Sequence, residues 1–248
     1  MNPGDLLVFT LLIAALTVSP SMQQTSTLSA FTKQKNKWAL LRAGEGVTVR
    51  AHVRFDLTVK QQGVSGTESN KSENGPMKDF TELFQLVEQY FHNESVRVNF
   101  KVESATQDDN LRVGSGNKSL NATETLKKVI QYAQKNLTTN DSILYFFSES
   151  QLLQQTKEGD QVDLDHDDVA TFGTFCSGNY SAAVVKYYRP GTTRHISAVE
   201  ATARVFGLTK YKGLSLRDIL QLLFTFPQCP RSECWMKCLQ PDEITGVN

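Results

Sequence analysis

The chain has 248 residues, with 26 basic and 26 acidic side chains and no formal net charge at neutral pH. This balance argues against nucleic acid or an anionic surface as the main partner. Without its leader the chain keeps about 225 residues, which suits one large domain with a substantial core.

The amino-terminal segment has the pattern of a signal peptide. Leu6 to Val18 is an apolar run that is too short to span a bilayer and long enough for a signal-peptide core. Ser19 and Ser21 supply small residues for cleavage, although the region before the apolar run lacks Lys and Arg. We therefore predict a signal peptide over residues 1–21, secretion to the extracellular space and no membrane anchor.

The rest of the chain alternates between strand-like and helix-like patterns. After a polar lead-in over residues 22–45, apolar and polar side chains alternate from Val47 to Lys60, as in a half-buried strand. The elements expected after it are a helix behind an Asp79 N-cap, a strand over Val96–Glu103, a helix from Thr123, a buried strand over Ser142–Phe147, strands over Val169–Phe175 and Ala182–Tyr188, and helices over 194–206 and Ser215–Phe224. This order predicts an α/β fold.

Cysteines and glycosylation sequons both indicate an oxidising, extracellular setting. The four cysteines fit two disulfides that would hold the carboxyl-terminal part together, and four cysteines permit three connectivities. They are Cys176, Cys229, Cys234 and Cys238. Chance predicts about two Asn-x-Ser/Thr sequons in a chain of this composition. The chain has seven, so we expect several surface glycans; the asparagines are Asn70, Asn93, Asn117, Asn121, Asn136, Asn140 and Asn179.

Three motifs in the second half of the chain resemble those of one protease family. They are Gly173-Thr174-Phe175-Cys176-Ser177 with the strand after it, the helix ending Phe206-Gly207-Leu208, and Cys234-Trp235-Met236. In this order they resemble the reprolysin (adamalysin) branch of the metzincin metalloproteases over residues 46–240. The high sequon count and the short tail at 241–248 look most like the members found in tick saliva.

The resemblance implies a zincin-like α/β domain with a twisted sheet, long helices and a disulfide-stapled carboxyl-terminal part. It also implies that Met236 belongs to the Met-turn. The family's pairing would join Cys229 to Cys234 and Cys176 to Cys238.

The helix that should carry zinc departs from the family pattern. In the family two histidines one turn apart and a third after a Gly turn bind zinc, and a Glu activates the metal-bound water. Aligned on Gly207, Glu200 occupies the first ligand position, Ala201 the base position, Arg204 the second ligand position and Lys210 the third. A register shifted by one restores Glu200 as the base but again supplies no histidine. Neither register predicts a zinc site.

Charge replacement is one interpretation of this helix. Glu200 and Arg204 are four residues apart, so they can pair, alone or with Lys210, and fill the zinc pocket. The alternative is an ordinary exposed helix pair. The best candidate for a calcium site is an acidic run, but nothing further supports calcium binding, and we interpret the run as a solvated loop. The run comprises Asp163, Asp165, Asp167 and Asp168.

These patterns predict a secreted, catalytically inactive metalloprotease-like glycoprotein, a pseudoenzyme that needs no cofactor. Its expected partner is an extracellular host or matrix protein, bound as an added strand along the edge strand Val169–Phe175. Two alternatives remain open: an active metalloendopeptidase of the reprolysin type with an atypical site, and a structural or carrier glycoprotein.

Overall fold

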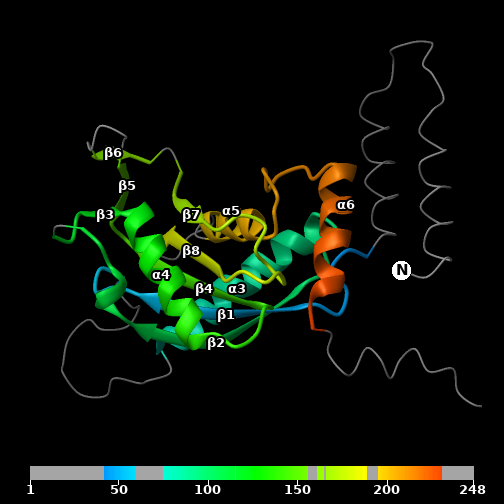
Figure 1. Cartoon of the computed structure of the whole chain (residues 1–248), viewed down its shortest axis with the longest axis horizontal. Helices are drawn as coiled ribbons and strands as arrows, with labels where there is room; N and C mark the ends of the chain where they lie inside the picture. The colour runs from blue at the N-terminus through cyan, green and yellow to red at the C-terminus, as the bar shows by residue number, and fades with distance from the viewer. Residues whose placement is uncertain are drawn as a thin grey trace, which may run out of the picture. The chain divides into compact units, whose positions relative to one another are not determined.

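The computed structural model describes residues 42–59, 75–114, 116–155, 161–164, 166–188 and 195–230, which belong to one compact unit (Figure 1). Its strands are β1 (Thr48–Phe55), β2 (Asn99–Gln107), β3 (Ser119–Asn121), β4 (Ser142–Ser148), β5 (Gln151–Gln155), β6 (Gln161–Asp163), β7 (Asp168–Ala170) and β8 (Ser181–Lys186). Its helices are α3 (Gly75–Asn93), α4 (Ala122–Asn136), α5 (Ile196–Val205) and α6 (Leu216–Thr225), with 3₁₀ turns η2 (Asp109–Leu111) and η3 (Phe226–Gln228).

A five-stranded sheet forms the centre of the described structure. Its strand order is β2-β1-β4-β8-β7; the first four strands are parallel, and β7 runs antiparallel to β8. β4 is buried along its whole length, which explains why its sequence is a continuous apolar run. β7 pairs with one neighbour only, so it forms an edge of the sheet.

Helices α3 and α5 cover one face of this sheet. The buried residues of β1 alternate with partly exposed ones, as the sequence predicts. Phe84 of α3 packs against Tyr145 of β4, with ring centroids 4.8 Å apart, and Phe91 packs against Phe206 at the end of α5, at 5.4 Å. Aromatic packing therefore fixes α5 relative to the sheet and to α3.

Helix α4 and a small second sheet cover the opposite face. Leu144 and Phe146 of β4 and Val184 of β8 pack there with Val129 of α4 and Leu120 of β3. The second sheet has the order β3-β5-β6. Helices thus lie on both faces of a largely parallel sheet (Figure 1), and the predicted α/β class is confirmed.

A buried arginine joins the carboxyl ends of β1 and β4 to the loop before β3. The Arg112 side chain, 9% exposed, donates to Asp56 Oδ2 at 2.6 Å and to Ser150 Oγ at 2.8 Å. It also donates to the backbone carbonyl oxygens of Gly116 and Ser119. Because Asp56 is fully buried, this pairing is what makes its charge tolerable in the interior.

Several predicted elements differ from the observed ones. The strand predicted from Val47 to Lys60 ends at Phe55, and the strand predicted over Val96–Glu103 runs over Asn99–Gln107. Helix α3 begins at Gly75, so Asp79 lies inside it and is not its N-cap. The strand expected over Val169–Phe175 is limited to β7. Gly173 and Cys176 have positive φ values of 64° and 54°, which an extended strand does not contain, so the chain turns there.

The observed disulfide joins Cys176 to Cys229. This corrects the pairings that the family resemblance implied, Cys176 with Cys238 and Cys229 with Cys234. The turn after β7 and the end of η3 bring the Cα atoms of Cys176 and Cys229 to 4.9 Å, within the range of a disulfide. Cys234 and Cys238 lie outside the described residues.

Other predictions also fall outside the described residues. These are the signal peptide at 1–21, most of the lead-in at 22–45, the sequon at Asn70, Met236, and the tail at 241–248. Among the described helices, none is long and apolar enough to cross a membrane.

Candidate functional site

Helix α5 carries the positions that align with the family's zinc site. Most of its residues are buried against the sheet. Glu200 and Arg204 lie one turn apart on the stripe that is only partly buried. The helix ends before Gly207, whose φ of 89° is in the left-handed region that favours glycine.

Glu200 and Arg204 form an ion pair. Arg204 Nη2 donates to Glu200 Oε1 at 2.9 Å, and the two side chains are 27% and 21% exposed. This confirms the predicted pairing. The pair is less exposed than an ordinary surface pair, so water screens its attraction less.

Arg204 has a second anionic neighbour on the edge strand. Its Nη1 lies 3.6 Å from Oδ2 of Asp168, the first residue of β7. Asp168 is fully buried, and within the described part of the chain neither of its carboxylate oxygens has a hydrogen-bond partner. Burial raises the pKa of Asp168 to about 7; Arg204 lowers it, while the charges of Glu200 and Asp167 raise it further.

His166 extends this group of polar side chains toward solvent. Its Nδ1 lies 3.4 Å from Glu200 Oε1, and its side chain is more than half exposed. His166, Glu200, Arg204 and Asp168 therefore follow one another as a row of polar side chains between α5 and β7, and we call these four residues the charged row. A carboxyl group with a strongly raised pKa beside a fixed cation is typical of functional sites, although structural ion pairs also produce it.

The two remaining zinc-aligned positions take no part in the charged row. Ala201 is fully buried in the core, where its methyl group offers no acid or base chemistry. Lys210 lies 3.7 Å from Asp218 Oδ2 at the start of α6, so it pairs there and not with Glu200. The interpretation with Lys210 as a third member is wrong, and the pair of Glu200 and Arg204 stands without it.

The residues at the zinc-aligned positions do not fit a zinc ion. Zinc needs thiolate, imidazole or carboxylate donors, and of Glu200, Arg204 and Lys210 only Glu200 offers one. Its carboxylate is already held by a guanidinium. In the described ranges no three His, Cys, Asp or Glu side chains come together as a possible metal site. We therefore derive no chemical step through a metal.

The acidic run is divided between separate partners. Asp163 lies on β6, Asp167 Oδ1 is 3.5 Å from Lys186 Nζ, and Asp168 faces Arg204. Asp165 lies outside the described residues. The solvated-loop interpretation is wrong for Asp168, which is buried. The signal in the sequence is strand alternation, which places Asp168 on the same face as Ala170, toward α5.

No protein-family model and no curated protein matches the chain. Solved structures similar to the chain include a metalloproteinase and an archaemetzincin. Metalloproteinase-II from Bacteroides fragilis has a TM-score of 0.40 and 11% identity, over 75% of this chain and 54% of its own. Archaemetzincin from Methanopyrus kandleri has a TM-score of 0.37 and 11% identity, over 72% of this chain and 86% of its own. The chain spans about half the length of the first structure.

These names correct one prediction. The degenerate helix predicted a protein that is not an enzyme, whereas the solved structures similar to the chain include a metalloproteinase and an archaemetzincin. We therefore no longer predict that the chain lacks enzyme activity. TM-scores and identities of this size assign the chain neither a family nor an activity.

Proposed function

We propose that the chain is a metalloprotease-like protein of the extracellular space that binds an extended segment of another protein along the free edge of β7. The motifs described above support a reprolysin-like relationship, most like the tick salivary members. The sequons and the apolar leader support secretion. A host or matrix protein is the partner that this setting favours.

The free edge of β7 is the observation that carries the proposal. The carbonyl oxygen of Asp167 and the N–H of Thr171 bond to β8 at 2.7 and 2.9 Å. Antiparallel strands bond through alternate residues, so Asp168 and Ala170 direct their backbone N–H and C=O groups away from β8. Within the described residues no other backbone group bonds to them. Asp168 is fully buried, whereas Ala170 is partly exposed, so an added peptide strand would bond first to the outward groups of Ala170.

The surroundings of this edge provide contacts for the side chains of a bound peptide. The charged row lies beside β7, because Asp168 belongs to both. Phe172, two residues beyond β7, is 60% exposed and offers an apolar contact. Backbone hydrogen bonds would supply affinity here, and the charges and Phe172 would supply selectivity.

A proline at the edge tests the proposal. Ala170→Pro removes the outward N–H of β7 and leaves the residues that bond to β8 unchanged. We expect it to weaken binding to a library of extended peptides at least about tenfold. Ala170→Ser, which keeps the N–H and nearly the same size, should bind as the wild type does. Mass analysis of the same peptides reports whether they are also hydrolysed.

A second measurement covers the case in which Ala170→Pro folds poorly. Amide hydrogen exchange of the wild-type protein, with and without a captured peptide, should show new protection at Ala170. Val169 already bonds to β8 and should change little. Peptides that bind without protecting Ala170, or that bind Ala170→Pro and Ala170→Ser equally, would refute the edge-strand proposal.

A further inference from the structure

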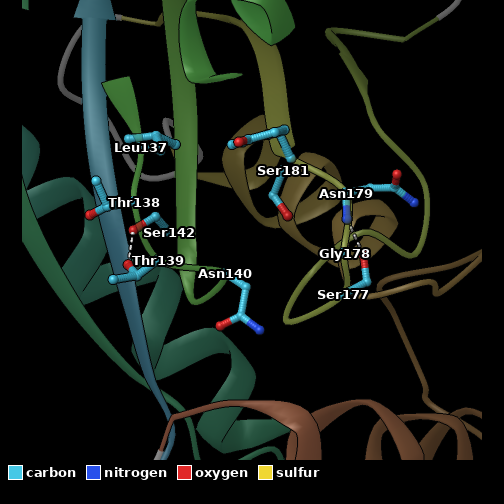
Figure 2. Close-up of a pocket in the computed structure, with 10 residues that line it drawn as sticks. Leu137, Thr138, Thr139, Asn140, Ser142, Ser177, Gly178, Asn179 and Ser181 are labelled. Carbon is cyan, nitrogen blue, oxygen red and sulfur yellow. Dashed lines mark hydrogen bonds between the residues drawn. The ribbon is translucent and has the colours of Figure 1, made fainter. Parts of the chain in front are cut away.

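A cavity of about 150 Å³ opens at the amino ends of β4 and β8 (Figure 2). The connection 137–142 between α4 and β4 forms one wall, and the turn 177–181 before β8 forms the other. The backbone N–H of Cys176 donates to the carbonyl oxygen of Asn140 at 2.9 Å, so the two walls are joined where the disulfide holds the chain.

The chemistry of this cavity suits a neutral ligand with many hydroxyl groups. No charged side chain lines it; the lining side chains are hydroxyls, amides, Leu137 and Tyr180. Most of these hydroxyls already have a partner: Thr139 and Ser142 bond to each other at 2.8 Å, Ser181 bonds to Thr174 at 3.0 Å, and Ser177 donates to the Thr174 carbonyl oxygen at 2.8 Å. A hydroxyl oxygen has two lone pairs, so each can still accept a bond from a ligand hydroxyl. Tyr180 is 38% exposed and presents an aromatic ring at the rim. A cavity on the order of 150 Å³ accepts a six-membered ring.

Two sequons of the chain lie at this same cavity. Asn140 and Asn179 both line it and are exposed, and the hydroxyls of their sequons, on Ser142 and Ser181, line it too. Among the described residues neither asparagine side chain has a hydrogen-bond partner. In Figure 2 Asn140 lies between the two walls, whereas the Asn179 side chain points away from the cavity.

We propose that this cavity is a carbohydrate site whose occupant is the N-linked glycan of Asn140 itself. Attachment at the rim gives the first sugar an effective concentration in the millimolar range. Weak contacts with the lining hydroxyls and with the Tyr180 ring are then enough to keep the first sugar bound in the cavity. This proposal rests on the proposed secretion of the chain, because N-glycans mark secreted proteins, but it does not depend on peptide binding at β7.

None of the other described sequons places its asparagine at this cavity, although Leu137 and Thr138 of the Asn136 sequon line it. Asn117 is exposed and lies outside it. Asn121 is buried, and its Oδ1 accepts the Glu124 N–H at 3.0 Å as the N-cap of α4. A glycan on the amide nitrogen of Asn121 would therefore have to displace the start of α4 from its packed position. Asn136 is exposed, but its Nδ2 donates to the Tyr132 carbonyl oxygen at 2.8 Å. Asn93 is exposed and does not line this cavity. Asn93 is therefore the reference for a glycan that is not bound in a cavity.

Release of the glycans from the native protein tests the proposal. The chain is produced in secreting eukaryotic cells, treated with an amidase that cleaves N-glycans from asparagine, and followed by peptide mass analysis. We expect release from Asn140 to be at least about tenfold slower than from Asn93. Denaturation should abolish the difference, and Asn121 should carry no glycan.

A matched pair of variants distinguishes binding of the glycan in the cavity from steric crowding around Asn140. A Cβ atom added at Gly178, which lines the cavity, meets nothing within 4 Å. Gly178→Leu should obstruct the cavity and make release from Asn140 as fast as from Asn93, while Gly178→Ala should leave it slow. Equal release from Asn140 and Asn93 in the wild type, an unmodified Asn140, or protection at Asn179 in its place would each overturn the proposal.

Discussion

Asp168 carries a carboxyl group that is buried beside a cation but has no hydrogen bond from the described residues. Its pKa is raised to about 7 in the folded protein from an ordinary value of 3.8. Between these pH values the folded state holds a proton that the unfolded state has lost. Stability contributed by this group is therefore complete below about pH 4 and is lost progressively up to about pH 7.

Asp168→Asn should remove this pH dependence. An amide stays neutral, so the variant should be more stable than the wild type at pH 8, by up to roughly 4 kcal/mol for a three-unit shift, and should differ less at pH 4. Urea unfolding at several pH values measures this. Glu45→Gln is the control, because the Glu45 side chain is 40% exposed and pairs with Arg42 at the surface. Equal pH slopes for Asp168→Asn and the wild type would contradict the assignment.

At the scale of elements, Arg112 holds the ends of β1 and β4 against the loop before β3. Its guanidinium contacts Asp56, Ser150 and two backbone carbonyl groups at once. A single ammonium group cannot reproduce this geometry. Removing the cation would leave Asp56 buried without its charged partner.

We expect Arg112→Met to lower the free energy of unfolding by roughly 3–5 kcal/mol, as for other broken buried ion pairs. Arg112→Lys should fall between Arg112→Met and the wild type. Arg42→Met is a suitable control, since Arg42 forms a salt bridge with Glu45 at the surface, and such pairs contribute about 0–1 kcal/mol. Urea titration compares them. If Arg112→Met lowered the free energy of unfolding no more than Arg42→Met, Arg112 would not hold these strand ends to the loop.

For the whole molecule, the disulfide between Cys176 and Cys229 connects residues 53 positions apart and ties the end of η3 to the turn after β7. Closing a long loop reduces the freedom of the unfolded chain. We expect Cys176→Ala combined with Cys229→Ala to destabilise the protein by roughly 2–4 kcal/mol in thermal or urea unfolding.

A glycine variant separates the cross-link from the backbone at Cys176, whose φ is 54°. Cys176→Gly with Cys229→Ala should be more stable than the alanine pair by about 1 kcal/mol, because glycine adopts positive φ without strain. A reducing agent should lower the unfolding midpoint of the wild type more than that of either double variant. Equal stability of all three proteins would show that this disulfide contributes nothing.

Periodicity in the sequence determined the main elements and the fold class. The alternation in β1, the continuous apolar run of β4 and the stripes of α3 to α6 each reflect burial on one or both faces, which a local pattern records directly. The spacing of Glu200 and Arg204 likewise predicted their pair, since residues four apart meet on a helix. The strands of the small sheet, three to five residues long, are too short to show a period.

Contacts between distant segments were decided only by the tertiary structure. Asp168 is 36 positions from Arg204, and the sequence pattern predicted that Asp168 lies in a solvated loop. The partner of Cys176, the separation of Lys210 from Glu200 and the cavity beside Asn140 depend in the same way on where the sheet places each loop. A local pattern records which face of an element is buried, but the partner across a gap follows from the packing of the whole domain.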